Sequence, residues 1–188
     1  QHGVTAEVVV IAAGGTAHFL PVDVRDPEGT VAMVDRAAEL MGGVDAVVDS
    51  AGVGAPPQAN GSVRRLVDVD VDGYDLVMDV NVKGVFVTCQ RAAQLMIAGG
   101  TGGTLVTLAS MAAKRPTAGV YSISKAACWM LTRCLAHELG EHGIRANAIG
   151  PGYVDTELFR SMVVAGAGDD ADAQDAWTEA RRKQVALG

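Results

Sequence analysis

The strongest constraint on the fold is an alternation of short apolar segments with longer segments of helical periodicity. Residues 28–41 carry apolar side chains at helical spacing and are closed by Gly42 and Gly43, and the apolar segment 44–48 follows. The same order then repeats twice along the chain, as a helix over about 71–98 begun by Asp70, a strand over 104–109, a helix over about 120–139 and a strand over 143–149.

Two further segments precede this alternation. Residues 4–13 predict a short helix that ends at Gly14-Gly15, where a left-handed residue can close a helix. Residues 17–24 predict a strand, and Pro21 places it at a sheet edge. Apolar strands that alternate with helices of this length are typical of a parallel sheet covered on both faces, so we expect the α/β class.

Composition and charge narrow the function classes. The 188 residues are 49% hydrophobic with 23 glycines, which fits one globular domain over 1–188. A net charge of −7 would repel nucleic acid. Three cysteines without Cys-x-x-Cys spacing predict reduced thiols, no metal site and a cytoplasmic location. No apolar run is long enough to span a membrane, and none resembles an export signal.

Tyr121 and Lys125 stand four residues apart at the start of the predicted helix 120–139. Residues at this spacing share one helical face, about 6 Å apart along the axis. An ammonium so close favours phenolate and predicts a lowered pKa of the tyrosine, so the pair could form a general acid/base for an alcohol or a carbonyl. An isolated pair of this kind is more often two surface residues of an ordinary helix, so the pair alone decides nothing.

The surrounding segments change that balance. Ser110 follows the strand 104–109, where open α/β sheets bind their ligands. The segment 147–156 leaves another strand through a Pro-Gly turn, Asp49-Ser50-Ala51-Gly52 ends a third, and Asn81 interrupts an apolar helix. With these elements in this order, residues 14–160 resemble the short-chain dehydrogenase/reductase family, which implies a Rossmann-like, doubly wound parallel sheet in three α/β/α layers.

The resemblance implies a role for four side chains. Tyr121 would be the catalytic acid/base, and Lys125 would lower its pKa and hold the ribose hydroxyls of the nicotinamide. Ser110 would bond the substrate oxygen, and Asn81 would anchor a water in the proton relay. Each of the last two has an alternative: Ser110 could be a turn residue, and Asn81 could satisfy backbone groups at a helix irregularity.

The family also implies a cofactor, NAD or NADP, which supplies the hydride chemistry. Asp23 and Val24 would lie beside the adenine, and the turn of Ser50, Ala51 and Gly52 would lie under the adenosine ribose. The wall around the carboxamide would consist of four residues, Pro151, Gly152, Val154 and Thr156. The core would span 14–152. Residues 153–188 would form the substrate lid, with a mobile loop over Val164–Asp172 and an amphipathic helix over Gln174–Leu187.

The sequence departs from the family in three ways. Residues 1–16 contain no Gly-rich phosphate-binding turn, since Gly14-Gly15 is expected to end a helix, and the last strand of the family is missing, so we expect a fold that is incomplete at both ends of this sequence. Asp49-Ser50 replaces the usual Asn-Asn. Ser110 lies 11 residues before Tyr121, about two fewer than usual in the family.

We therefore expect an oxidoreductase that transfers a hydride between NAD(P)(H) and a secondary alcohol or ketone. A non-catalytic relative that serves as a binding or scaffold module is the alternative. The sequence specifies neither the substrate, the preferred nucleotide nor the direction of the reaction. Apolar residues on more than one face of helices 71–98 and 120–139 predict subunit contacts, in a homodimer or homotetramer.

Overall fold

The protein is described by a computed structural model that covers residues 2–54, 65–116 and 118–183. Its sheet consists of β1 (Ala46–Asp49), β2 (Gly103–Leu108) and β3 (Ile144–Ile149). The α-helices are α1 (His2–Ala12), α2 (Pro27–Met41), α3 (Val71–Met78), α4 (Val85–Gly99), α5 (Val120–Leu139), α6 (Glu157–Ala167) and α7 (Ala171–Arg182). Short helical turns are η1 (Leu66–Asp68), η2 (Asp79–Gly84), η3 (Met111–Lys114) and η4 (Gly140–His142).

The three strands are parallel, in the order β1-β2-β3. Asp49, the last residue of β1, is in register with Thr107 of β2, and Leu108 is in register with Ile149 at the end of β3. All three strands therefore end at the same edge of the sheet, and the segments that follow them start there. The expected α/β class with a parallel sheet is confirmed.

The helix boundaries follow from local signals. The carboxylate of Asp26 accepts a hydrogen bond from Glu28 N at the start of α2, and Gly42 ends that helix with φ 79°. Asp70 caps α3 in the same way, by accepting a bond from Gly73 N. Gly14, with φ 83°, follows the end of α1. The cap by Asp70 and the helix ends at Gly42 and Gly14 were predicted from the sequence and are confirmed, whereas the cap by Asp26 was not predicted.

The helix predicted over 71–98 is continuous but not regular. The α-helices α3 and α4 are joined by η2, one π-helical turn over Asp79–Gly84. A π turn is frequent where a helix carries a functional side chain. Here it contains Asn81, which is fully buried.

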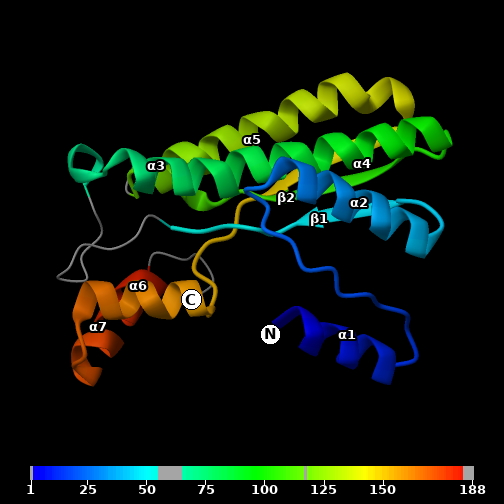
Figure 1. Cartoon of the computed structure of the whole chain (residues 1–188). Coiled ribbons are helices and arrows are strands. Elements are labelled where there is room, and N and C mark those ends of the chain that lie inside the picture. The colour runs from blue at the N-terminus through cyan, green and yellow to red at the C-terminus, as the bar shows by residue number, and fades with distance from the viewer. Residues whose placement is uncertain (1, 55–64, 117, 184–188) are drawn as a thin grey trace.

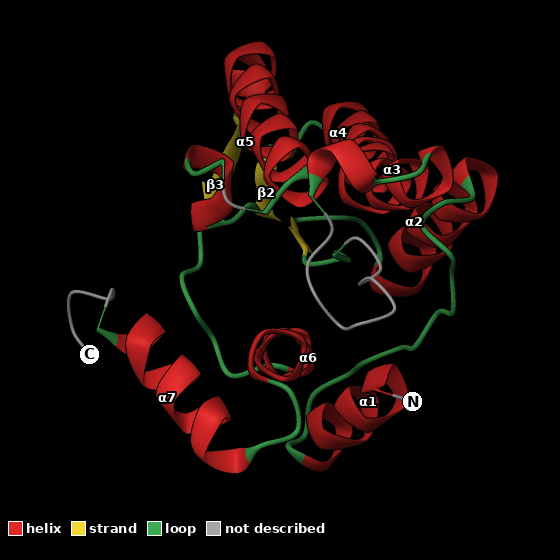
Figure 2. Cartoon of the chain, turned by 90° about the vertical axis from the view of Figure 1, so that its left-hand side faces the viewer, coloured by secondary structure: helices red, strands yellow, loops and turns green. Residues whose placement is uncertain are grey.

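The hydrophobic core lies between the sheet and one layer of helices. Helices α2, α3, α4 and α5 lie side by side on one face of the sheet, as Figures 1 and 2 show from two directions. The core between them is formed by small and medium apolar side chains, among them Val85, Cys89, Ala92, Met96, Leu105, Cys128 and Ile144.

The opposite face of the sheet is not covered in the same way. Helices α1, α6 and α7 lie on that side (Figure 1), yet Val48 is 67% exposed and Ile149 is 51% exposed. Both side chains alternate with residues that face the core, so they point away from it. The helix layer packed against the sheet is therefore the one formed by α2 to α5.

Two predictions for individual segments are wrong. Residues 17–24 form no strand, because within the described chain no strand lies beside them to accept and donate ladder hydrogen bonds. The loop expected over 164–172 is also wrong: α6 continues to Ala167, and α7 begins at Ala171. The side chain of Asp170 accepts a hydrogen bond from Ala173 N and caps α7, so the helix begins at Ala171, three residues before the predicted start at Gln174.

Candidate active site

The carboxyl edge of the sheet gathers the predicted site residues. Ser50 to Gly52 follow β1, Ser110 follows β2 by two residues, and Gly150 to Gly152 follow β3. The first turns of α5 lie against the segment that follows β2. Parallel topology alone thus brings together segments that are about 60 and 100 residues apart in the chain.

Tyr121 lies between Ser110 and Lys125. The hydroxyl of Ser110 lies close enough to its phenol to lower the phenol's pKa. The ammonium nitrogen of Lys125 lies 5.7 Å from the centroid of its ring. The expected grouping of these three side chains is present, although the loop between Ser110 and Tyr121 is short.

The pKa of Tyr121 shifts in the direction opposite to the one expected. Burial raises it above its ordinary value, and the nearby hydroxyl of Ser110 opposes this only in part. Burial also lowers the pKa of the Lys125 ammonium, because a charged group loses its hydration there. Desolvation is therefore the largest influence on the pKa of both groups, and the phenol is protonated at neutral pH.

Lys125 is held at the ends of two strands. Its side chain is 4% exposed, and its ammonium donates a hydrogen bond of 2.7 Å to the carbonyl oxygen of Leu108. A Cβ atom placed on Gly52 would lie 3.2 Å from the same nitrogen. The absence of a side chain at Gly52 thus lets the turn after β1 approach the cation. Within the described residues this is the one hydrogen bond of the ammonium, which leaves two of its three hydrogens for a ligand.

Asn81 connects the turn after β1 to helix α5. Its Oδ1 accepts a hydrogen bond of 2.8 Å from Val53 N, and its Nδ2 donates to Val53 O and to Ser124 Oγ, both at 2.9 Å. The sequence left open, as an alternative, that Asn81 satisfies backbone groups at a helix irregularity. Asn81 does bond backbone groups, but they belong to Val53 in the turn after β1 and not to the helix.

Ser124 is a site residue that sequence reasoning missed. It is fully buried, accepts the hydrogen bond from Asn81 and donates one of 2.9 Å to the carbonyl oxygen of Tyr121. Its position immediately before Lys125, on the side of α5 that faces the core, was the signal that could have identified it. Ser110 likewise has a second role, because its Oγ accepts a bond from Ala112 N and begins η3.

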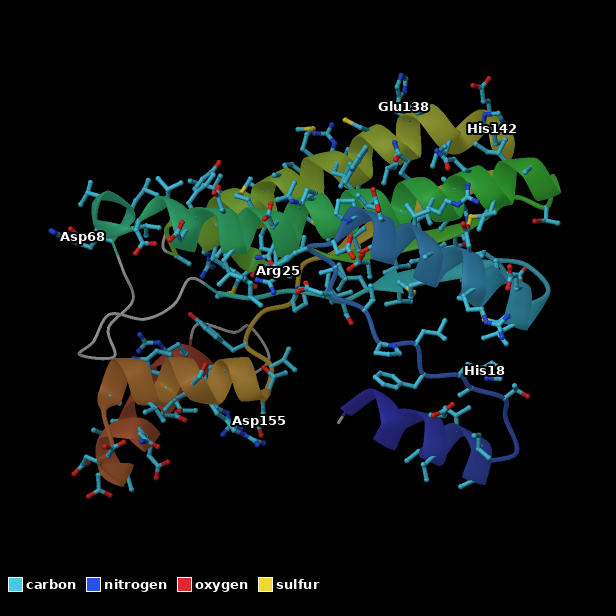
Figure 3. All side chains as sticks on the ribbon, viewed as in Figure 1. His18, Arg25, Asp68, Glu138, His142 and Asp155 are labelled. Carbon is cyan, nitrogen blue, oxygen red and sulfur yellow. The ribbon has the colours of Figure 1, made fainter. Side chains whose placement is uncertain are left out.

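The two residues predicted beside the adenine differ in their surroundings. Val24 packs against the π turn, where a Cβ atom on Gly84 would lie 2.9 Å from the Val24 Cβ. Asp23 is exposed and forms an ion pair with Arg25, the residue labelled in Figure 3, which lowers the pKa of the carboxyl to about 2. Its charge is therefore already paired.

The segment after β3 lies against the one after β2. Pro151 O accepts a hydrogen bond of 3.0 Å from Met111 N, next to Ser110. Gly152 follows at the same edge, Val154 is 54% exposed, and the Thr156 hydroxyl caps α6 by accepting a bond from Phe159 N. The predicted carboxamide wall thus begins beside Ser110, but its last member is engaged in a helix cap.

The residues of this edge fit the nicotinamide-ribose half of a dinucleotide. Gly52 leaves room beside a buried cation that keeps free donors, and ribose hydroxyls are acceptors that such donors bind. The other half has less support, since Gly14 closes α1 and opens no helix at the sheet.

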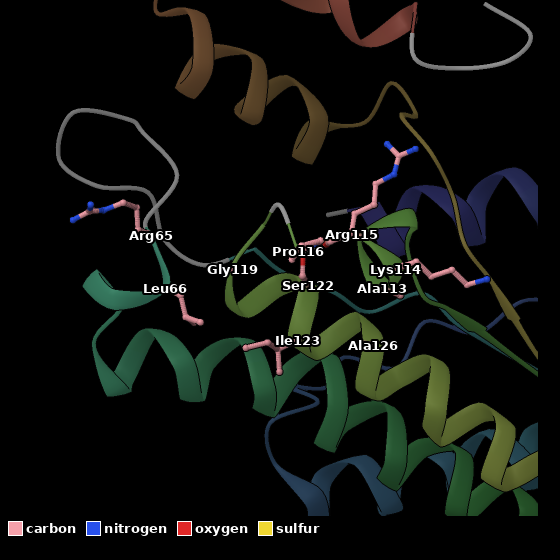
Figure 4. A pocket seen from close by; sticks show the side chains of 11 residues that line it. Arg65, Leu66, Ala113, Lys114, Arg115, Pro116, Gly119, Ser122, Ile123 and Ala126 are labelled. Atoms are coloured by element: carbon pink, nitrogen blue, oxygen red, sulfur yellow. Dashed lines mark hydrogen bonds between the residues drawn. The ribbon is translucent and has the colours of Figure 1, made fainter.

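A separate cavity of about 640 Å³ lies between η1, η3 and the start of α5 (Figure 4). Its walls include Leu66, Pro116 and Ile123 together with the basic side chains of Lys114 and Arg115. None of the four proposed catalytic side chains lines it. The cavity is therefore a neighbour of the candidate site and not the site itself.

Comparison with known proteins identifies the family. Residues 2–184 match the family described as enoyl-(acyl carrier protein) reductase. The 2,5-dichloro-2,5-cyclohexadiene-1,4-diol dehydrogenase of Sphingobium indicum is 35% identical over 86% of this chain and 63% of its own length. The chain spans 28% to 63% of the length of the curated relatives that it matches.

Solved structures agree with this result. Carveol dehydrogenase from Mycobacterium avium, in complex with NAD, is 30% identical with a TM-score of 0.76, over 82% of this chain and 55% of that one. A short-chain dehydrogenase from Burkholderia cenocepacia, in complex with NADP, is 32% identical with a TM-score of 0.76, over 97% and 67%. Because residues 2–184 match the family and the parallel sheet resembles these solved structures, the chain belongs to the short-chain dehydrogenase/reductase family.

Proposed function

We propose that the protein is an oxidoreductase that transfers a hydride between a nicotinamide cofactor, NAD or NADP, and a secondary alcohol or ketone. The observation that carries this proposal is the phenol of Tyr121 with Ser110 and the ammonium of Lys125 beside it, at the carboxyl edge of a parallel sheet. Relatives named for a cyclic diol and for carveol support a small alcohol as substrate.

The chain's own residues would handle the proton. Because burial keeps Tyr121 protonated, the phenol is in the form that donates a proton to a carbonyl oxygen. Ser110 lies beside this phenol and would orient the same oxygen. Lys125 would stabilise the phenolate that remains after the transfer, since its ammonium lies near the ring and is screened from water. In the opposite direction Tyr121 would accept the proton of the alcohol.

A bound nicotinamide would supply the hydride. Lys125 would hold ribose hydroxyls with the donors that Leu108 leaves free. The turn after β1 and the segment after β3 would enclose the ring, with Gly52 and Pro151 closest to the residues of the site. Asn81 would keep the turn and α5 together, and would place the relay water expected for the family.

Substitution of Tyr121 by phenylalanine tests the acid/base. We expect the turnover of a panel of cyclic alcohols and ketones, assayed with both nucleotides, to fall by about 100-fold or more, because general acid/base catalysis contributes 10²–10⁴-fold. The binding of NADH or NADPH, followed by fluorescence, should persist. Tyr74→Phe, on the exposed surface of α3, is the matched control and should leave turnover unchanged. Full activity of the Tyr121→Phe variant would remove the proposed acid/base.

The same fluorescence titration separates the enzyme from a non-catalytic module. A chain that binds neither nucleotide and turns over no substrate would favour the alternative of a binding or scaffold protein. This titration is needed because Gly14 closes α1 and does not open a helix at the sheet, where a phosphate-binding turn would lie. Binding of either nucleotide at micromolar concentration would support the enzyme.

We further propose that the chain forms a homodimer or homotetramer through α4 and α5, and that residues 153–188 act as a substrate lid. Phe86 on α4 is 41% exposed and Met130 on α5 is 47% exposed, which supports an apolar contact. A monomer in light scattering would contradict the first proposal.

Free thiols at Cys89 and Cys128 agree with a cytoplasmic location. In the described part of the chain, no helix has both the length and the apolar character needed to cross a membrane.

A further inference from the structure

Asp49 is a buried acid to which the proposed mechanism gives no role. It is the last residue of β1, and its side chain is turned toward the helix layer with only 7% of the residue exposed. Its Oδ1 accepts a hydrogen bond of 3.2 Å from Ala51 N. Among the described residues, no other hydrogen-bond partner of this carboxyl group is found. Burial raises the pKa of this carboxyl group above its ordinary value, and the hydrogen bond from Ala51 N opposes the rise together with a second source of stabilisation of the carboxylate.

That source is the cation at the ends of the neighbouring strands. Asp49 is in register with Thr107 on β2, and the next residue, Leu108, accepts the hydrogen bond from the Lys125 ammonium. The turn that starts at Asp49 passes the same ammonium at Gly52. The two charges form no direct salt bridge. They share one water-excluded region, however, and charges there act over longer distances than in water.

The other titratable groups in this region are neutral at physiological pH. Burial raises the pKa of the Cys128 thiol on α5 and raises that of Cys89 on α4 to about 12. Tyr121 is protonated for the same reason. Burial lowers the pKa of Lys125, and two neighbouring groups oppose this by raising it. The larger of these two influences comes from Cys128 and the smaller from Asp49. Because the thiol carries no charge until alkaline pH, Asp49 is the acid of this cluster that can supply a negative charge to Lys125 at lower pH.

We propose that Asp49 is a positioning residue whose buried carboxylate is the counter-charge that keeps the Lys125 ammonium protonated at the ends of β1 and β2. An amide at this position could hold Ala51 N equally well but would supply no charge. The catalytic consequence of this inference rests on the proposed function, because it acts through Lys125. The charge pairing itself does not depend on turnover and is tested separately.

The test compares Asp49→Asn with the parent chain by NMR of protein labelled with ¹⁵N-lysine. The chain has four lysines, at positions 83, 114, 125 and 183, and Lys125→Arg identifies the signal of interest. We expect the titration midpoint of the Lys125 Nζ to fall by about one pH unit in Asp49→Asn, which is a tenfold change in the protonation equilibrium. Asp45→Asn removes the same charge just before β1, where the residue is exposed, and should leave the midpoint unchanged.

The outcomes distinguish the possibilities. A midpoint of Lys125 that is the same in Asp49→Asn and in the parent chain would overturn the inference, even if the enzyme is active. A lowered midpoint would support it even if no substrate is found. If Asp49→Asn does not fold, the titration of the parent chain alone tests the inference. The chemical shift of Lys125 Nζ in the parent chain should show a second inflection at acid pH, where Asp49 titrates. The absence of that inflection would also overturn the inference.

Discussion

Replacement of Asn81 by alanine should weaken both the fold and the site. The side chain is fully buried and takes part in three hydrogen bonds, two with the backbone of Val53 and one with Ser124. With a net contribution of about 1 kcal/mol for each bond, we expect the free energy of unfolding to fall by about 3 kcal/mol. The turn after β1 would also lose its connection to α5, so that Gly52 and Lys125 are no longer held together.

A double-mutant cycle isolates the bond between Asn81 and Ser124. Urea unfolding would be measured for the parent chain, for Asn81→Ala, for Ser124→Ala and for the double variant. We expect Ser124→Ala to cost about 1–2 kcal/mol, because it also removes the bond to Tyr121 O, and the coupling between the two sites to be about 1 kcal/mol. Asn147→Ala, at an exposed position of β3, is the matched control and should cost less than about 0.5 kcal/mol.

Two results would refute this reasoning. A loss for Asn81→Ala that is no greater than that of the exposed control would mean that water replaces the three bonds without cost. Independent effects of the two substitutions would mean that the contact of 2.9 Å between Asn81 and Ser124 contributes nothing. In that case, the π turn over Asp79–Gly84 could not be explained by the need to place the amide of Asn81.

Two further predictions concern titratable groups. Cys89 is fully buried with its pKa raised to about 12, and Cys128 is also buried, whereas Cys134 is exposed. A thiol reagent at pH 8 should therefore modify Cys134 alone in the folded chain and all three thiols in denaturant. Rapid modification of a second thiol in the folded chain would contradict this prediction. Asp23 should titrate at about pH 2 by carboxyl NMR and return toward 3.8 in Arg25→Gln, because the ion pair lowers its folded pKa. Its contribution to stability is present above the unfolded pKa and is lost as the pH falls through the folded value, and a midpoint near 3.8 in the parent chain would exclude the pairing.

Elements that depend on nearby residues were predictable from the sequence. The predicted helix over 120–139 matches α5, and the predicted strand over 104–109 matches β2 within one residue. Periodicity, caps and glycine stops act within a few residues, so a single sequence contains them. The grouping of Ser110, Tyr121 and Lys125 was also predictable, because parallel topology brings the ends of all strands to one edge.

Elements that depend on distant partners were not predictable in the same way. Residues 17–24 have the composition of a strand, but a strand forms only where another chain segment completes its hydrogen bonds. The partner of Asn81 lies 28 residues earlier in the sequence, in a turn whose position depends on β1. The exposure of Val48 shows likewise that an apolar alternation indicates which side chains could be buried, and not whether anything covers them.

For this protein, the order of residues by itself determined the helices, the parallel strands and the set of side chains at their carboxyl ends. Only the tertiary structure decided the state of charge of those side chains. It gave Tyr121 a raised pKa where proximity to Lys125 predicted a lowered one, and it buried Asp49 in the same region as the Lys125 ammonium. The physical reason is that desolvation depends on every segment that excludes water from a group, whereas spacing along a helix reports only one neighbour.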